Sequence, residues 1–113
     1  MNDNLCNLLI NKGELKQNVF NVTLETMQLF KDCAKNFEDY YKNKYADDHE
    51  NISVLYTNKN QYQFQLKFAG DVLVFLMHSN IFEFSRDHEV MRTSYIKEDP
   101  ERSYCGMIQI YNF

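Results

Sequence analysis

The residues best suited to bind a ligand are concentrated in one polar segment, residues 86–102. All three arginines of the 113-residue chain lie in it, and guanidinium groups bind carboxylates and phosphates through paired hydrogen bonds. Loops also carry a large share of binding residues in proteins. A solvated surface loop is the competing interpretation, and we favour it. If the chain binds an anionic ligand, we expect it to use Arg86, His88, Arg92, Tyr95 and Arg102.

Other reactive residues are scattered along the sequence. Cys6, Cys33 and Cys105 are widely spaced, with no CxxC or Cys/His cluster for zinc and no disulfide framework. No motif ties a histidine to Cys105, so we expect a small buried thiol there and not a nucleophile. Residues 47–50 (Asp-Asp-His-Glu) lack the shaping glycine of a calcium loop. With no P-loop, dinucleotide fingerprint, HExxH or GxSxG motif, we predict no metal and no cofactor, and we favour a non-catalytic role.

The composition bears on partners and compartment. The net charge is −4 and the sequence pI is near 5.3, so a nucleic-acid partner is not expected. The lysines at 31, 35 and 42 are interspersed with acidic residues, which predicts a solvated mixed-charge face. The longest apolar run, residues 72–77, is too short to span a bilayer. With no secretory signal at the N-terminus, we predict a cytoplasmic protein without a membrane partner. Abundant Asn and Lys beside scarce Arg and Ala suggest an AT-rich bacterial genome.

The first element that the sequence predicts is a long helix. Gly13 breaks or bends the chain after the short apolar segment 3–10, and Asn11 and Glu14 have the spacing of a capping box, so the helix is predicted over residues 14–45. At 100° per residue its apolar side chains fall in one stripe, as a core-facing helix requires. The predicted stripe consists of Leu15, Val19, Val22, Thr26, Leu29, Phe30, Cys33, Phe37, Tyr40 and Tyr41.

From Ile52 onward the apolar pattern changes to a period of two. Residues 62–68 alternate most regularly, which predicts a strand with one buried and one solvated face. The expected strands are 52–57, 62–68, 72–77, 81–85 and 104–113. The sequence therefore predicts an α+β fold with a long N-terminal helix on a four- to five-stranded antiparallel meander. In element order alone, this layout resembles that of cystatin-type proteins.

Strand 72–77 is apolar on both faces, so its orientation is ambiguous. Leu73, Phe75 and Met77 could face inward as readily as the alternate set. We take the orientation in which Val74 and Leu76 face inward. The predicted core then consists of Phe30, Cys33, Phe37, Phe64, Leu66, Phe68, Val74 and Leu76.

Several features favour association of the chain with itself. The helix is long for a compact domain of 113 residues, and it carries a second apolar row that either residues 5–10 or another subunit could cover. The last strand runs to Phe113 without a turn signal, as expected of an interface strand or of the N-terminal part of a longer protein. We expect one domain over residues 1–113 and a homodimer, with an interface formed by Phe20, Leu24, Met27, Ile110 and Phe113. The function predicted is protein interaction or assembly, and a small enzyme or ligand-binding protein using residues 86–102 is the alternative.

Overall fold

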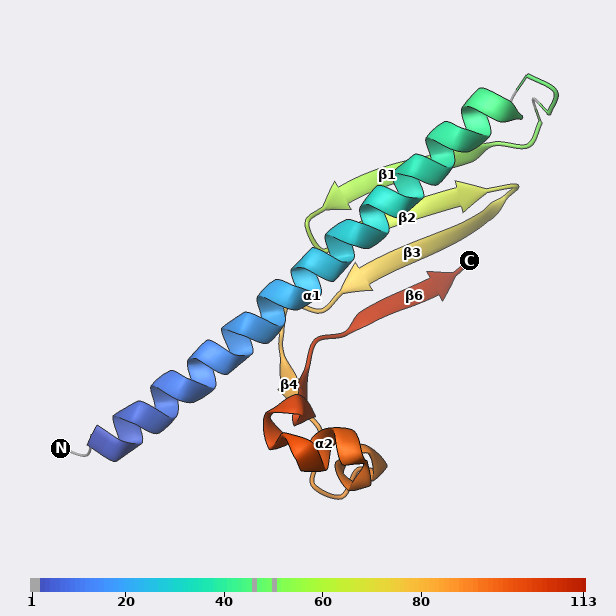
Figure 1. Ribbon diagram of the computed structural model, residues 1–113. Coiled ribbons are helices and arrows are strands. Elements are labelled where there is room, and N and C mark those ends of the chain that lie inside the picture. The colour runs from blue at the N-terminus through green and yellow to red at the C-terminus, as the bar shows by residue number, and fades with distance from the viewer. Residues whose placement is uncertain (1–2, 46, 50) are drawn as a thin grey trace. The chain divides into compact units, whose positions relative to one another are not determined.

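A computed structural model of the protein describes residues 3–45, 47–49 and 51–113 (Figure 1). Glu50, the last residue of the acidic segment at the end of the predicted helix, lies outside these ranges. The helices and strands follow one another in the order α1 (Asp3–Lys44), β1 (Val54–Asn60), β2 (Gln63–Phe68), β3 (Asp71–Met77), β4 (Phe82–Glu83), the 3₁₀-helix η1 (Glu89–Arg92), α2 (Ser94–Glu98), the 3₁₀-helix η2 (Pro100–Ser103), β5 (Tyr104–Cys105) and β6 (Ile108–Asn112).

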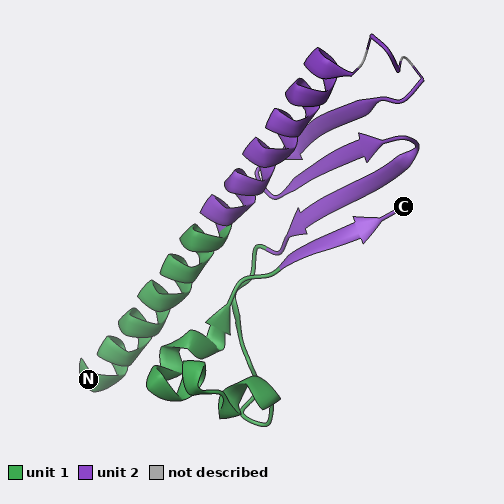
Figure 2. Cartoon of the chain, turned by 45° about the vertical axis from the view of Figure 1, so that its right-hand side comes forward, with its two compact units in different colours: residues 1–23, 79–107 green, residues 24–78, 108–113 purple. Residues whose placement is uncertain are grey.

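The chain divides into two compact units, shown in green and purple in Figure 2. Unit 1 consists of residues 1–23 and 79–107, and unit 2 consists of residues 24–78 and 108–113. Helix α1 contributes its first part to unit 1 and the remainder to unit 2. The expectation of one domain over the whole chain stays a prediction.

Unit 2 contains a four-stranded sheet in the order β1-β2-β3-β6, and every neighbouring pair is antiparallel. The second part of α1 packs on the β1 side of this sheet, and β6 is the strand farthest from it (Figure 1). The predicted α+β class with an antiparallel sheet is therefore confirmed. The first three strands form the predicted meander, with bounds close to those expected.

The tight hairpin between β2 and β3 follows from its two connecting residues. Ala69 and Gly70 both have positive φ, 49° and 91°, as the type I′ turn of a two-residue hairpin requires. Glycine adopts this conformation without cost, whereas a residue with a Cβ is strained in it. The connection between the predicted strands 62–68 and 72–77 is thus a tight turn, and Ala69 is its strained position.

Helix α1 begins at Asp3, so the predicted start at residue 14 is wrong. Asn11 and Glu14 lie inside the helix and do not cap it. One glycine in a helix interior costs only about 1 kcal/mol relative to alanine, and the good helix formers around Gly13 offset it. Because residues 5–10 continue the helix, they do not fold back over its apolar row.

The buried face of α1 also differs from the predicted stripe. Met27, Lys31, Ala34 and Glu38 are its buried residues, and their i, i+4, i+7, i+11 spacing defines one helical face. Phe30 belongs to the predicted stripe and directly precedes Lys31, but it is 39% exposed. Two charged residues lie on the buried face because they form hydrogen bonds with β1, so the solvated face predicted for Lys31 is wrong.

The core of unit 2 is built around Phe64, which is fully buried. Its ring stacks on that of Phe75 with 4.3 Å between centroids. Phe64 and Phe75 are register partners, so Leu73, Phe75 and Met77 share the face that α1 covers. The alternative orientation of this strand is therefore the correct one, and Val74 and Leu76 point to the opposite face. Phe64 is confirmed as core, whereas Phe30, Cys33 and Phe37 lie at its exposed margin.

Unit 1 contains a two-stranded sheet of β4 and β5 and the short helices η1, α2 and η2. The predicted strand 81–85 is thus only two residues long, and the predicted strand 104–113 is divided into β5 and β6. Gly106 lies at this division. A Cβ built on it would stand 2.2 Å from Oγ1 of Thr23 on α1, so only glycine permits this close approach.

Candidate functional site

The five residues predicted to bind an anion all lie in unit 1, and the structure engages some of them internally. His88 precedes η1 and caps it, because its Nδ1 accepts a hydrogen bond from the Val90 N–H at 3.1 Å. Its ring also lies 4.7 Å from that of Phe84. These contacts give His88 a structural role at the start of η1.

Tyr95 and Arg102 are brought together. The Arg102 guanidinium lies over the Tyr95 ring, 4.6 Å from its centroid. It donates hydrogen bonds to the Tyr95 carbonyl at 3.1 Å and to the Glu98 carboxylate at 3.3 Å. Arg102 therefore ties α2 to η2, and its charge is partly balanced by Glu98.

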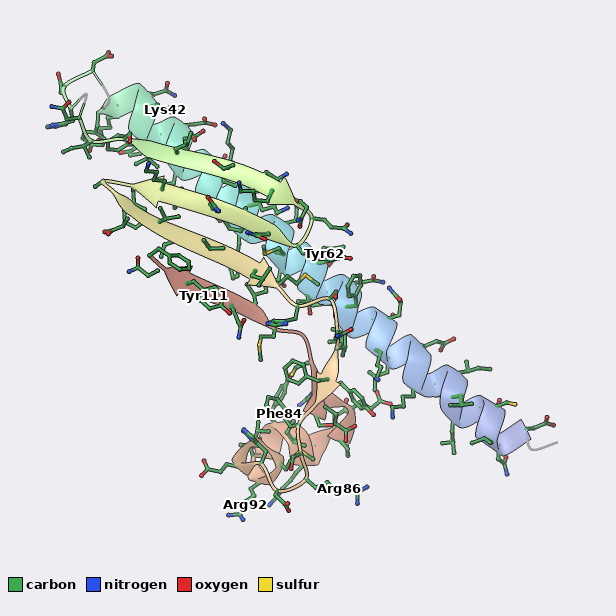
Figure 3. The ribbon with its side chains drawn as sticks, turned by 180° about the vertical axis from the view of Figure 1, so that it is seen from behind. Lys42, Tyr62, Phe84, Arg86, Arg92 and Tyr111 are labelled. Carbon is green, nitrogen blue, oxygen red and sulfur yellow. The ribbon has the colours of Figure 1, made fainter. Side chains whose placement is uncertain are left out.

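Arg86 and Arg92 are different. Both are exposed, and neither forms a hydrogen bond or ion pair with the residues that the structure describes. Figure 3 shows the two side chains pointing away from the ribbon at separate points. The structure thus pairs Tyr95 with Arg102 but does not gather the three guanidinium groups around one position.

The residues predicted to form an interface differ in accessibility. Met27 has 0% exposure and belongs to the core of its own chain, and Phe20 and Leu24 are half-buried. Ile110 is 55% exposed and Phe113 is 75% exposed. Of the predicted set, the two residues at β6 offer the most accessible apolar surface.

An open apolar groove lies in unit 2 beside α1. Its volume is about 250 Å³, and it opens on the sheet face that carries Phe64. The sequence missed it, because its helical residues were assigned to the core and β3 was given the opposite orientation. The groove is lined by Phe30, Cys33, Ala34, Phe37, Leu66 and Phe75.

The outer edge of β1 is closed by two buried side chains of α1. The Glu38 carboxylate accepts a hydrogen bond from the Tyr56 N–H. Lys31 Nζ donates to the Asn60 carbonyl at 2.6 Å and to Asn58 Oδ1 at 2.9 Å. The Tyr56 N–H and the Asn60 carbonyl are therefore satisfied by side chains of α1, which opposes the pairing of another strand at these positions.

The two buried charges respond differently to burial. Desolvation lowers the pKa of Lys31 below its usual value. For Glu38, burial alone would raise the pKa, but the hydrogen bonds from Lys35 and the Tyr56 N–H, together with the charge of Lys42, lower it on balance. Lys35 lies 2.7 Å from the carboxylate. Glu38 is thus held as an anion at the sheet edge.

The outer edge of β6 has no such cover. Val72 and Phe113 exchange both backbone hydrogen bonds, at 3.0 and 2.8 Å. Because hydrogen-bonded and non-hydrogen-bonded pairs alternate in an antiparallel ladder, the N–H and C=O groups of Ile108, Ile110 and Asn112 must point away from β3. No hydrogen bond to these outward groups comes from the described part of the chain.

Residues 3–45, 47–49 and 51–113 contain neither a cluster of metal ligands nor a membrane-spanning helix. No group of three or more His, Cys, Asp or Glu residues there could hold a metal ion. Among the helices described, none is both long and apolar enough to cross a bilayer.

The sequence was compared with known proteins in three ways. It matches no family model, and no significant match was found among curated proteins or solved structures.

Proposed function

We propose that this chain is a non-catalytic protein-interaction and assembly domain of the bacterial cytosol, and that it forms a homodimer. The proposal rests on one observation: unit 2 has apolar side chains and an open strand edge that no described residue covers. The groove beside α1 and the open β6 edge belong to the same unit, and Ile110 is the register partner of Phe75, which lines the groove.

Exposed apolar surface of this kind favours a partner. A soluble protein seldom exposes a large contiguous apolar patch unless the patch binds something. Phe37 is 48% exposed at the groove, and the strand at the open edge carries no charged residue to oppose pairing. Symmetric dimers are the commonest assemblies that cover such a surface.

The bacterial and cytosolic parts of the proposal come from composition. The chain has 13 Asn and nine Lys but only three Arg and three Ala, a bias that suits an AT-rich genome. Its three widely spaced cysteines form no disulfide framework in the sequence, which suits a reducing compartment.

The test is the molar mass of the purified chain as a function of concentration. Sedimentation equilibrium from micromolar to hundreds of micromolar should show a reversible monomer–dimer equilibrium, with the dimer fraction rising with concentration. A monomer mass throughout this range would refute the homodimer.

The alternative, an anion-binding protein, has its own test. Arg86 and Arg92 are the arginines of the 86–102 segment that the described residues leave without a partner, so an anion bound by guanidinium groups should require them. Thermal unfolding would be followed with inorganic phosphate, citrate and nucleotides, since a bound ligand raises apparent stability by mass action. A saturable rise in melting temperature that disappears in Arg86→Gln/Arg92→Gln would favour ligand binding over assembly.

A further inference from the structure

We propose that the partner at this surface is a second copy of the chain, joined to the first edge to edge through β6. Two four-stranded sheets would then form one continuous antiparallel sheet around a two-fold axis at Ile110. This inference rests on the proposed function, and it specifies the partner, the strand and the register.

The backbone of β6 provides the first argument. The outward N–H and C=O groups belong to alternate residues, Ile108, Ile110 and Asn112. An added strand must present its own donors and acceptors with the same alternation. A second β6, running antiparallel and centred on Ile110, meets this requirement, because Ile108 is then opposite Asn112 of the other copy and Ile110 is opposite Ile110.

The side chains provide the second argument. In this register the two Ile110 side chains meet across the axis on the same sheet face as Phe75, and β-branched pairs in direct opposition stabilise a sheet. Gln109 of one copy lies opposite Tyr111 of the other on the reverse face. Their polar groups already form a hydrogen bond within one chain, from the Tyr111 hydroxyl to Gln109 Oε1 at 2.5 Å.

Charge provides the third argument. Natural edge strands usually carry lysine or another charge that discourages pairing. No charged side chain occurs from Ser103 to Phe113, so two copies of β6 would meet without repulsion. A charged peptide partner, in contrast, would find no complementary charge on this strand. A second copy is therefore the occupant that fits the edge best.

The main test places like charges on the axis. Ile110→Lys sets two ammonium groups directly opposite each other, and we expect the dimer dissociation constant to rise about tenfold or more, equivalent to about 1.4 kcal/mol. The side chain is 55% exposed, so the monomer should accommodate lysine, and thermal unfolding of the variant would verify that it folds. The matched control is Leu8→Lys, which introduces the same charge at a 67% exposed position of α1 in unit 1.

A second test reports the register itself. In a chain whose natural cysteines are replaced by Ser or Ala, Ile110→Cys should form an intermolecular disulfide on mild oxidation, because opposed hydrogen-bonded residues have Cα atoms about 5.5 Å apart. Gln109→Cys in the same background should cross-link poorly, since its own copy lies about a diagonal step, 7–8 Å, away.

The outcomes separate this inference from the proposed function. Loss of the dimer in Ile110→Lys but not in Leu8→Lys, with selective cross-linking of Ile110→Cys, supports pairing through β6. A dimer that survives Ile110→Lys and dissociates in Leu8→Lys overturns β6 pairing and moves the interface to α1, while the assembly function stands. A wild-type chain that remains monomeric refutes both.

Discussion

Along β1, hydrogen-bonding groups at the outer edge of the sheet meet buried side chains of α1, whereas along β6 the corresponding groups meet no described part of the chain. The contrast lies within one unit and one sheet. At the β1 edge, Lys31 is 5% exposed and Glu38 is 2% exposed. At the β6 edge, Ile110 is 55% exposed. One edge is closed with charges, and the other presents an aliphatic side chain.

The closed edge requires favourable contacts to offset a large cost. Moving an ammonium or a carboxylate out of water is unfavourable unless hydrogen bonds and opposite charges compensate. Glu38 accepts a hydrogen bond from the Tyr56 N–H and lies near two lysines. Lys31 donates hydrogen bonds to two oxygen atoms of β1. A helix that closes an edge therefore needs long polar side chains on its buried face, placed where the strand backbone can reach them.

At the β6 edge of the same sheet, no side chain of α1 covers the strand. Phe75 and Ile110 are register partners on the face that α1 packs against. The buried face of the helix covers Phe64, and a groove stays open between α1 and the side chains of Leu66 and Phe75. The two edges thus differ in packing: α1 closes one of them, and the other is the surface at which we propose that the chain assembles.

The largest expected effect concerns the core on the covered side. Phe64→Ala removes a fully buried ring and its stacking on Phe75, so the free energy of unfolding should fall by about 3–5 kcal/mol. Urea unfolding followed by circular dichroism measures it. A loss below about 1 kcal/mol would show that this face is not the core.

A smaller effect is expected at the closed edge itself. Lys31→Met retains most of the apolar stem but leaves the Asn60 carbonyl and Asn58 Oδ1 without their donor, so stability should fall by about 1.5–3 kcal/mol. Lys12→Met is the matched control, because Lys12 is an exposed lysine of α1 that forms no hydrogen bond or ion pair with the described residues. Equal losses in the two variants would contradict the idea that Lys31 closes the edge.

The sequence predicted the fold class and the first three strands because their signals are local. Alternation in residues 62–68 fixes which side chains share a face, and the two residues after Phe68 support a tight turn. The helical period of α1 was equally clear. Its start was misplaced because Gly13 was treated as a break, although one glycine changes helix stability only slightly.

The site could not be predicted as far, because it depends on how elements pack. Periodicity does not reveal that α1 packs beside the β1 edge, where Lys31 and Glu38 form hydrogen bonds with the strand and are buried in place of Phe30 and Phe37. Nor does it orient β3, whose two faces are equally apolar. A cue for Lys31 and Glu38 did exist: they share a helical face with Met27 and Ala34, which a wider stripe would have included.

The pH dependence of stability should identify the role of Glu38. Its pKa in the folded protein is lowered below the usual 4.5, so the folded state binds this proton more weakly than the unfolded state. The stabilisation is therefore complete above the unfolded value and is lost as the pH falls through the folded value. Glu38→Gln should cost about 1–1.5 kcal/mol at neutral pH, because a neutral acceptor replaces a charged one.

Urea unfolding of both proteins from about pH 7 to about pH 3 would measure this difference. The stability curves of wild type and Glu38→Gln should converge as the medium becomes acidic, since the wild-type carboxyl group is then neutral as well. Parallel curves over the whole range would mean that Glu38 is not held as an anion at the β1 edge.

The smallest effect on the monomer is expected at the open edge, and it should depend on protein concentration. Ile110→Ala shortens a side chain that is more than half exposed, so dilute protein should lose about 1 kcal/mol or less. At concentrations where the wild-type chain dimerises, the variant should appear less stable by a larger amount, because dimerisation stabilises the folded wild type by mass action. Phe64→Ala should show its full loss even in dilute protein, where dimerisation contributes nothing.

Thermal unfolding of the variants and the wild type at micromolar and at hundreds of micromolar concentration tests this concentration dependence. An Ile110→Ala effect that is the same at both concentrations would remove β6 from the assembly surface, and the two edges would then differ in packing alone.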